Sequence, residues 1–210
     1  MTHILIRSEC RDNEKRVGIT PLEAKNLLNH GIKVSIEESK SRIIPVSNYR
    51  DVGCEIVKEK SWPNAPLETI IFGLKELPDD PFPLKHRHIM FGHAFKGQPT
   101  AKNLLNRFKA GGGVLYDIEY LIATTGKRVA AFGYWAGYAG AAVTISCWVS
   151  QKAKKSPKTF TPYQDKDSLD RQIKRELEKS KHSPKNAIVI GSLGRVGSGV
   201  IDLCEKMNIK

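Results

Sequence analysis

The sequence has few cysteines and no long apolar run, and both shortages narrow the classes of protein to which it can belong. Its four cysteines lie far apart without a CxxC pair, so their spacing indicates neither a zinc site nor a disulfide framework. The most apolar run, residues 136–149, is too short to span a bilayer and is rich in small residues, which favours a buried helix. The first residues also lack the apolar stretch of a secretory signal. We therefore expect a cytoplasmic protein with no membrane span and no metal site.

Positive charge is in excess, and it is unevenly distributed. The formal net charge is +12, and residues 151–185 supply half of it, with eleven Lys and Arg against five Asp and Glu. Such a segment can bind nucleic acid. It has only two aromatic residues, Phe160 and Tyr163, and no nucleic-acid motif, so we expect a solvated linker and no nucleic-acid partner. A basic surface would also attract nucleotides and polyanionic substrates, and charge alone does not separate these possibilities.

Short apolar runs alternate with amphipathic segments, which is typical of an α/β protein with a mostly parallel sheet. The clearest helix start is Thr20-Pro21-Leu22-Glu23, a capping box with Pro in the first turn, and Gly31 closes that helix. Strands are expected at 3–7, 32–36, 55–57, 70–73, 89–92, 114–116, 128–132 and 186–190. The other helices are expected at 98–109, 134–151, 168–179 and 196–207, with a short one that Ser47 caps and that ends at Gly53.

This pattern predicts a Rossmann-like domain over residues 1–133. An inter-domain helix and the basic linker would follow over 134–185, and the first βα unit of a second Rossmann domain over 186–210. Because a lone strand and helix lack neighbours to bury their apolar faces, we expect 186–210 to be poorly protected from hydrogen exchange.

The stretch 70–95 holds two proton-handling side chains in matching positions. Lys75 and His93 each follow a short apolar run that ends in Phe-Gly. Buried strands of this kind belong to parallel sheets, whose ligands bind just beyond the carboxyl ends of the strands. If the two strands are close in the sheet, an amine and an imidazole share one crevice and can perform acid–base catalysis. Either residue taken alone could be a surface lysine or a core histidine.

Four further charged residues are candidates for the same site. Glu76 and Glu119 could adjust the pKa values of Lys75 and His93, although each could equally be exposed. Arg16, just before the capped helix, and Arg128, at the start of an expected strand, could each hold a carboxylate in a bidentate fork. Most arginines are surface residues, so position alone gives these two little weight.

A glycine-rich turn follows the last expected strand. Residues 187–203 read A-I-V-I-G-S-L-G-R-V-G-S-G-V-I-D-L, and backbone N–H groups at such a helix start favour phosphate. The alternative is a tight turn that uses glycine for structural reasons alone. The nucleotide interpretation requires an acidic residue roughly 20 residues past the loop to bind the ribose. Only eleven residues follow Gly199, so we expect either a longer protein or a vestigial nucleotide site.

Six ordered motifs together resemble the NAD-dependent, lysine-forming saccharopine dehydrogenase family, and more distantly alanine dehydrogenase and the transhydrogenase NAD-binding subunit. They are N-E-K-R-V-G-I-T-P, I-I-F-G-L-K-E-L-P, H-I-M-F-G-H-A-F-K, L-Y-D-I-E-Y-L, G-K-R-V-A-A-F-G-Y-W-A-G-Y-A-G-A-A and I-G-S-L-G-R-V-G-S-G-V-I-D-L. The resemblance implies two Rossmann-like domains with the active site in the cleft between them. Members of the family are markedly longer, so it also implies that much of the cofactor domain has no counterpart in these residues.

In that family saccharopine loses hydride to NAD at the carbon that bears its secondary amine, and the resulting imine is hydrated and collapses to lysine and 2-oxoglutarate. The resemblance implies that Lys75 takes the amine proton and that His93 serves hydration and collapse. It implies that Arg16 and Arg128 hold substrate carboxylates while Glu76 and Glu119 adjust the acid–base pair. The pyrophosphate of NAD would lie on the loop formed by Gly191, Gly194, Arg195, Val196 and Gly197. The alternative function is a non-catalytic module that binds substrate or regulates a partner.

Overall fold

The computed structural model describes residues 1–11, 13–131, 133–180 and 184–210. These residues form two compact units, Met1–Ala130 and Ala131–Lys210. Each unit has its own hydrophobic core, and each is described by itself.

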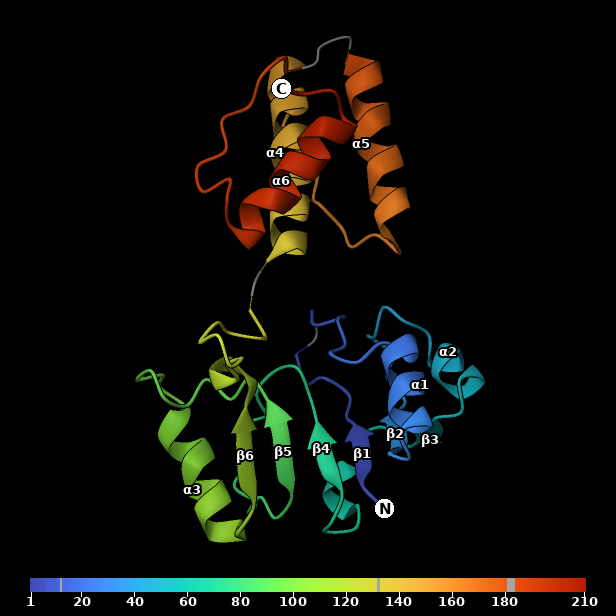
Figure 1. The fold of residues 1–210 in the computed structure, drawn as a ribbon, viewed down its shortest axis with the longest axis vertical. Coiled ribbons are helices and arrows are strands. Elements are labelled where there is room, and N and C mark those ends of the chain that lie inside the picture. Colours follow the sequence, from blue (N-terminus) through green and yellow to red (C-terminus); the bar gives the residue numbers. More distant parts are fainter. Residues whose placement is uncertain (12, 132, 181–183) are drawn as a thin grey trace. The chain divides into compact units, whose positions relative to one another are not determined.

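The first unit is built on a six-stranded sheet in the order β3-β2-β1-β4-β5-β6. All five strand pairings are parallel, which confirms the expected α/β fold. Figure 1 shows the arrowheads of β1, β4, β5 and β6 pointing the same way. The strands are β1 (His3–Ile6), β2 (Lys33–Glu37), β3 (Glu55–Val57), β4 (Ile70–Phe72), β5 (Arg87–Met90) and β6 (Val114–Asp117).

Helices and short turns cover both faces of this sheet. Successive residues of a strand point to opposite faces, and in β1 Leu5 enters the core that contains Leu104 and Phe108, whereas Ile6 enters the core that contains Ala24 and Tyr49. A sheet buried on both faces requires the near-continuous apolar strands found in the sequence. The elements that supply the covering side chains are α1 (Pro21–Asn29), α2 (Val46–Asp51), α3 (Ala101–Gly111) and the 3₁₀ turn η1 (Trp62–Asn64). A further 3₁₀ turn, η2 (Ile118–Tyr120), follows β6 and has no buried residue.

Sequence signals predict two helix starts in this unit, and one of the two predictions is wrong. The capping box of α1 is present, because the Thr20 hydroxyl accepts from the Glu23 N–H and the Glu23 carboxylate accepts from the Thr20 N–H at 2.7 Å. Ser47, in contrast, does not cap α2, since that helix begins at Val46 after Pro45 and has no side-chain cap. Proline fixes the backbone of Pro45 in an extended conformation, which places the helix start earlier than expected.

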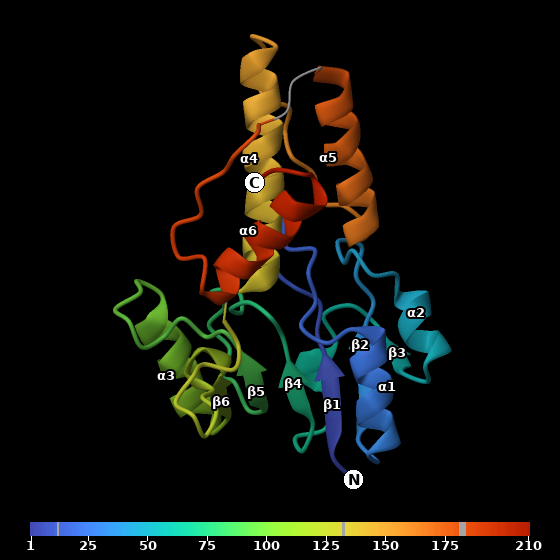
Figure 2. The ribbon, with the colours of Figure 1, turned by 45° about the horizontal axis from the view of Figure 1, so that its top comes forward.

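The described residues of the second unit form the helices α4 (Tyr134–Lys152), α5 (Lys166–Ser180) and α6 (Arg195–Lys206), and α6 crosses α4 in Figures 1 and 2. Glycine permits this crossing. A Cβ atom on Gly137 would lie 1.8 Å from the Val196 carbonyl oxygen, and one on Gly199 would lie 2.0 Å from the Tyr134 carbonyl oxygen. The helices share one core, which includes Leu203, Cys204 and Met207 of the C-terminal segment, so the expectation that α6 lacks packing partners is wrong.

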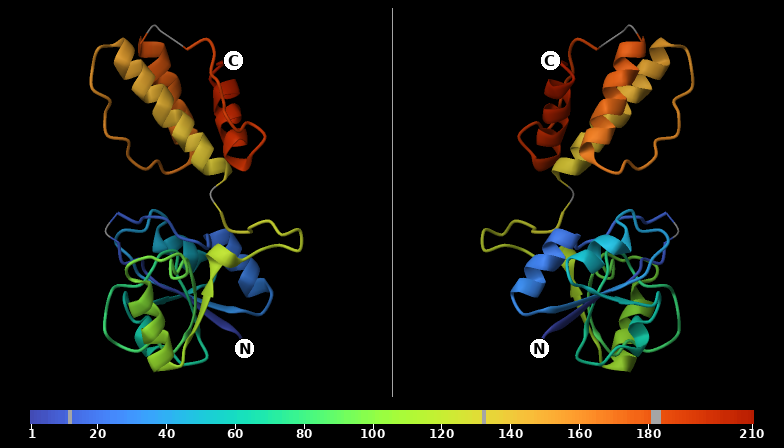
Figure 3. Two further views of the ribbon diagram at one scale, coloured as in Figure 1. Left: turned by 90° about the vertical axis from the view of Figure 1, so that its left-hand side faces the viewer. Right: turned by 90° about the vertical axis from the view of Figure 1, so that its right-hand side faces the viewer.

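The helix α5 lies within the basic segment 151–185. It buries Leu169, Asp170 and Ile173 in the second unit, whereas most of its other charged residues are exposed. Figure 3 shows the preceding connection, residues 153–165, as an open loop between α4 and α5. Among the described residues, no helix is long and apolar enough to cross a membrane.

Two expected strands are absent. Residues 186–190 form no strand, and Ile188 and Ile190 are 94% and 97% exposed. An isolated segment cannot form a ladder, and the described part of the second unit offers it no parallel strand. Of the expected strand 128–132, only Arg128 forms a bridge, an isolated antiparallel one with Ile122, and Phe132 lies outside the described residues.

Candidate active site

The sheet of the first unit has a topological switch point between β1 and β4. The chain builds outward from β1 through β2 and β3, then returns to the other side of β1 with β4, β5 and β6. In folds of this kind ligands bind at the carboxyl ends of the strands on either side of the switch point, which here are β1 and β4. The residues that follow β1 and β4 are therefore the first candidates for a site.

Lys75 and His93 lie at this edge of the sheet on neighbouring strands. Phe72 of β4 is paired in register with Ile89 of β5, and beyond the strands the Phe91 N–H donates to the Leu74 carbonyl at 3.3 Å. Each side chain follows closely after this last contact, and each is neither buried nor fully exposed. A shared site for Lys75 and His93 requires their strands to be close in the sheet, and β4 and β5 are neighbours.

The backbone at His93 is strained. Its φ angle is +49°, in the left-handed region that residues other than glycine rarely adopt. Such conformations persist where the surrounding structure enforces them, and they cluster at ligand sites. The neighbouring Gly92 is closely packed, because a Cβ atom there would lie 2.9 Å from the Cδ2 methyl group of Leu115, which would have to move. The turn after β5 is thus tightly packed and sets the direction of the imidazole.

Glu76 lies next to Lys75 and forms an ion pair with Arg11, which comes from the loop after β1. Burial alone would raise the pKa of Glu76, but hydrogen bonds and the positive charges of Arg11 and His93 hold it below its ordinary value. Glu76 is therefore a carboxylate at neutral pH, and it acts electrostatically on the imidazole of His93. Arg11 was not predicted from the sequence, because nothing in its position distinguishes it from a surface arginine.

Glu119 follows β6, and two cations surround it. Its carboxylate accepts from the Lys96 amine at 2.5 Å and lies 3.8 Å from the Arg128 guanidinium. The hydrogen bond from Lys96 is the main reason that the pKa of Glu119 is lowered, with further contributions from Arg128 and His93. The structure thus brings the predicted Glu119 and Arg128 together and adds Lys96, which the sequence analysis did not select.

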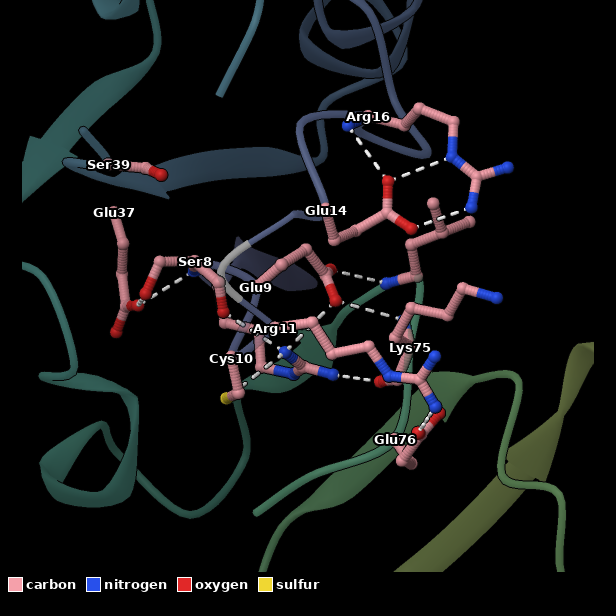
Figure 4. Close-up of polar contacts among 12 residues, drawn as sticks. Ser8, Glu9, Cys10, Arg11, Glu14, Arg16, Glu37, Ser39, Lys75 and Glu76 are labelled. Carbon is pink, nitrogen blue, oxygen red and sulfur yellow. Dashed lines mark hydrogen bonds and ion pairs between the residues drawn. The ribbon is translucent and has the colours of Figure 1, made fainter. Parts of the chain in front are cut away.

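Arg16 lies in the loop between β1 and α1, where it forms a two-pronged ion pair with Glu14. The Arg16 Nε and Nη2 atoms donate to the two Glu14 carboxylate oxygens at 2.8 and 2.6 Å. These hydrogen bonds lower the pKa of Glu14, to which the charge of Lys75 also contributes, and raise that of Arg16. Figure 4 shows this pair close to Lys75. A planar guanidinium already oriented in this way can turn one edge to an incoming carboxylate.

The six predicted side chains of the first unit therefore follow the carboxyl ends of four consecutive strands, β1, β4, β5 and β6. A lysine, a histidine, two carboxylates and two arginines at one edge can exchange protons with a substrate and bind its carboxylates. No group of three or more His, Cys, Asp or Glu side chains that could hold a metal occurs among the described residues.

The glycine-rich turn belongs to the second unit. Gly191 has a φ angle of +82°, and Gly194 caps α6 without a side-chain hydrogen bond. A Cβ atom on Gly197 would lie 2.3 Å from the Gly191 carbonyl, so this glycine is required by the turn itself. Arg195 and Val196 begin α6, and Val196 also lines a cavity of about 540 Å³ between α4, α6 and residues 184–189. A second cavity, of about 510 Å³ beside Trp135 and Tyr163, contains none of the predicted site residues.

Comparison with known proteins shows the family to which this chain belongs. Residues 5–139 match the N-terminal domain of the alanine dehydrogenase/PNT family, and the chain belongs to that family. Two solved structures share the fold at low identity. The first is an L-alanine dehydrogenase, 14% identical, which aligns with a TM-score of 0.59 over 100% of this chain and 53% of its own. The second is a transhydrogenase from Sinorhizobium meliloti, 13% identical, which aligns with a TM-score of 0.54 over 96% of this chain and 62% of its own.

Curated relatives share more sequence identity with this chain than these two structures do. Saccharopine dehydrogenase [NAD(+), L-lysine-forming] of Yarrowia lipolytica is 42% identical over 97% of this chain and 57% of the relative. The enzyme of the same name from Schizosaccharomyces pombe is 40% identical over 99% and 58%. Mitochondrial alpha-aminoadipic semialdehyde synthase of Bos taurus is 31% identical over 65% of this chain and 14% of its own length. The chain thus spans little more than half the length of the saccharopine dehydrogenases that it matches.

Proposed function

We propose that this chain provides the substrate-binding and acid–base part of an NAD-dependent, lysine-forming saccharopine dehydrogenase. The observation that carries the proposal is the placement of Lys75 and His93 after neighbouring parallel strands, beside the switch point of the sheet. The relatives of that name, at 40–42% identity, support the choice of substrate.

In this proposal Lys75 accepts the proton of the secondary amine as the adjacent carbon loses its hydride, which leaves a carbon–nitrogen double bond in the substrate. His93 then removes a proton from the water that adds to this carbon, while the nitrogen takes back the proton held by Lys75. In the collapse that follows, the new hydroxyl group releases its proton to solvent as the carbonyl forms, His93 gives its proton to the nitrogen, and the carbon–nitrogen bond breaks to give lysine and 2-oxoglutarate. Arg16 and Arg128 bind substrate carboxylates. Glu76 and Glu119, whose pKa values are lowered, supply two negative charges beside this acid–base pair.

The glycine-rich turn is the place in this chain for the pyrophosphate of NAD, which when bound would accept the hydride. Gly191, Gly194 and Gly197 form a tight turn before α6, whose first N–H groups lack a side-chain cap and suit a phosphate. Arg195 is the first residue of this helix, and Val196 supplies one of these N–H groups. The turn fits the pyrophosphate, but residues 186–190 before it have no sheet to fix them.

The test combines binding and turnover. We expect saccharopine and 2-oxoglutarate to bind in calorimetry and NADH to form from saccharopine and NAD. Replacing Lys75 by Met should lower turnover by roughly 10²-fold, the usual contribution of a positioned acid–base group. Replacing Lys33 by Met is the matched control, because Lys33 lies at the start of β2, the opposite end of the strands, in an exposed pair with Glu55. Saccharopine turnover that is unaffected by Lys75→Met would refute the assigned role.

One structural observation favours a second candidate function, a module that binds substrate without catalysis. The turn that should hold NAD follows Ile188 and Ile190, which are almost fully exposed and belong to no strand, so the nucleotide site is less fixed than the substrate site. This candidate requires saccharopine or 2-oxoglutarate to bind while NAD does not. Binding of NAD in calorimetry would contradict it, and failure of all three ligands to bind would contradict both candidates. A cytoplasmic location stays a prediction, which cell fractionation can test.

A further inference from the structure

The peptide groups around Lys75 lie where the backbone hydrogen bonds of β4 end. The Gly73 N–H still donates to the Ile89 carbonyl at 3.0 Å, as in a regular ladder. The next two N–H groups, of Leu74 and Lys75, donate instead to the two carboxylate oxygens of Glu9, at 2.7 and 3.0 Å. The Lys75 carbonyl accepts from the guanidinium of Arg7. Figure 4 shows the Glu9 carboxylate facing the backbone at Lys75.

The side chains of Arg7 and Glu9 are buried and form an ion pair with each other. Their side chains are 0% and 8% exposed, and they pair with each other at 3.5 Å. A Cβ atom on Gly73 would lie 2.4 Å from the Arg7 guanidinium carbon. The guanidinium therefore occupies the space that a side chain at position 73 would need. Hydrogen bonds that involve charged groups in such surroundings are stronger than those between neutral groups.

A second buried carboxylate fixes the segment that carries the two residues. Glu37, at the end of β2, is fully buried and accepts from the Ser8 N–H at 2.8 Å, the Ser8 hydroxyl at 2.9 Å and the Trp62 N–H at 2.8 Å. Arg7 in turn donates to the Ser8 carbonyl at 3.0 Å. The ends of β1, β2 and β4 are thus linked by side chains at the switch point.

We infer that Arg7 and Glu9 form a clamp that positions Lys75 for proton transfer, an inference that rests on the proposed function of Lys75. They are positioning residues, because they contact the Lys75 backbone and leave its amine free to meet a substrate. A lysine side chain is long and flexible, and a displacement of about 1 Å in a catalytic group can cost roughly 10²-fold in rate. Fixing both peptide groups of Lys75 limits the region that its amine can reach.

The inference predicts effects that a general loss of stability would not produce. Glu9→Gln keeps the shape of the side chain but replaces one acceptor by a donor, so the carboxylate can no longer accept both N–H groups. Gly73→Ala keeps Arg7 and Glu9 and displaces the guanidinium, which provides a second variant should the first fail to fold. The matched control is Glu55→Gln, because Glu55 belongs to an exposed pair with Lys33 at 2.8 Å, and such pairs contribute little.

Two measurements decide the inference. Hydrogen exchange followed by NMR should show the Leu74 and Lys75 amides exchanging at least roughly tenfold faster than in the wild-type chain, both in Glu9→Gln, which loses a charged hydrogen bond to these amides, and in Gly73→Ala, in which the displaced Arg7 no longer holds the Glu9 carboxylate in place. The kcat for saccharopine should fall roughly tenfold or more with a smaller change in KM, since the substrate contacts remain. Glu55→Gln should change neither quantity.

The results separate this inference from the proposed function. Wild-type exchange at both amides in Glu9→Gln and Gly73→Ala would overturn the clamp, and so would faster exchange with an unchanged kcat. An equal effect of Glu55→Gln on these amides would also overturn it. Absence of turnover in the wild-type chain would count against the proposed function alone, because the exchange of the two amides reports on the clamp directly.

Discussion

His88 and His93 lie five residues apart and have opposite surroundings. His88, in β5, is 1% exposed and lies between the rings of Trp62 and Phe108, with ring-centre distances of 5.1 and 5.3 Å. Neither of its ring nitrogens has a hydrogen-bond partner among the described residues. Burial, aided by the charge of Arg7, lowers the pKa of His88 to about 3. His93 lies just past the strand in a turn that water can reach. His88 is therefore unsuited to proton transfer near neutral pH.

The pKa of His88 predicts acid sensitivity of the first unit. In the unfolded chain this histidine protonates near its ordinary pKa of 6.5, whereas in the folded chain it stays neutral down to about pH 3. Its contribution to stability is therefore complete above pH 6.5 and is lost progressively as the pH falls from 6.5 toward 3, by about 1.4 kcal/mol per pH unit. Urea unfolding of wild type and His88→Leu should show a smaller loss between pH 7 and pH 5 in the variant. The exposed His30, replaced by Gln, is the control, and equal losses in all three proteins would contradict the prediction.

The left-handed backbone of His93 allows its chemistry to be separated from its structural role. Asn adopts this conformation more readily than most residues, so His93→Asn should change the free energy of unfolding by less than about 0.5 kcal/mol. His93→Val, with a branched Cβ, should lose about 1–2 kcal/mol. If His93 assists hydration, both variants should lower saccharopine turnover by roughly 10²-fold. Full turnover by His93→Asn would exclude that role.

At the scale of elements, the glycine-rich turn joins two segments of very different packing. Ile188, Ile190 and Leu193 are 94%, 97% and 104% exposed, whereas Leu203 and Ile209 are 0% and 4% exposed in the core of the second unit. A strand needs a neighbour for its backbone groups, but a helix bonds its own backbone and needs only one surface on which to pack. The segment before the turn has no neighbouring strand among the described residues and stays exposed, whereas α6 has the surface of α4 on which to pack.

This difference predicts a sharp boundary in hydrogen exchange. The amides of residues 188–193 should exchange at close to the rate of an unfolded chain, whereas the later amides of α6 should be protected as strongly as those of α4. Mass spectrometry of overlapping peptides can locate the boundary, with α6 as the internal reference. Slow exchange at residues 188–190 would show that another strand, from a second copy or from a longer chain, pairs with them.

At the scale of the whole molecule, the two units have separate cores. The core clusters of the first unit and that of the second have no residue in common. Destabilising one unit should therefore leave the other folded. Gly137→Ala provides the test, because its Cβ atom would lie 1.8 Å from the Val196 carbonyl and force α6 away from α4. We expect a loss of about 1–3 kcal/mol in the second unit, the usual cost of overpacking.

Gly140→Ala is the matched control, since a Cβ atom there meets nothing within 4 Å on the same helix. This variant should be neutral or more stable by about 0.5–1 kcal/mol, because alanine favours a helix interior over glycine. Regional hydrogen exchange should show α4, α5 and α6 losing protection in Gly137→Ala while β1 to β6 keep theirs. Loss of protection throughout the sheet would show that the two units fold as one.

Local signals in the sequence were sufficient for the parts of the fold that depend on neighbours along the chain. Thr20 and Glu23 form their capping box as predicted, and the apolar runs before Lys75 and His93 are neighbouring parallel strands. Prediction failed at residues 186–190 and 128–132, where the strand pattern is present but a regular partner is missing. The pattern of one segment carries no information about whether a second segment is available to pair with it.

By itself the sequence determined the alternation of elements, the parallel sheet and the charged residues that follow its strands, because periodicity, caps and glycines act over short distances. Only the tertiary structure decided that β1 and β4 lie side by side. That pairing places the carboxylate of Glu9 and the guanidinium of Arg7 on the backbone of Lys75, 66 and 68 residues away. Nothing near Arg7 or Glu9 in the sequence distinguishes them from surface charges. Their partners are set by strand order, which depends on the packing of the whole unit.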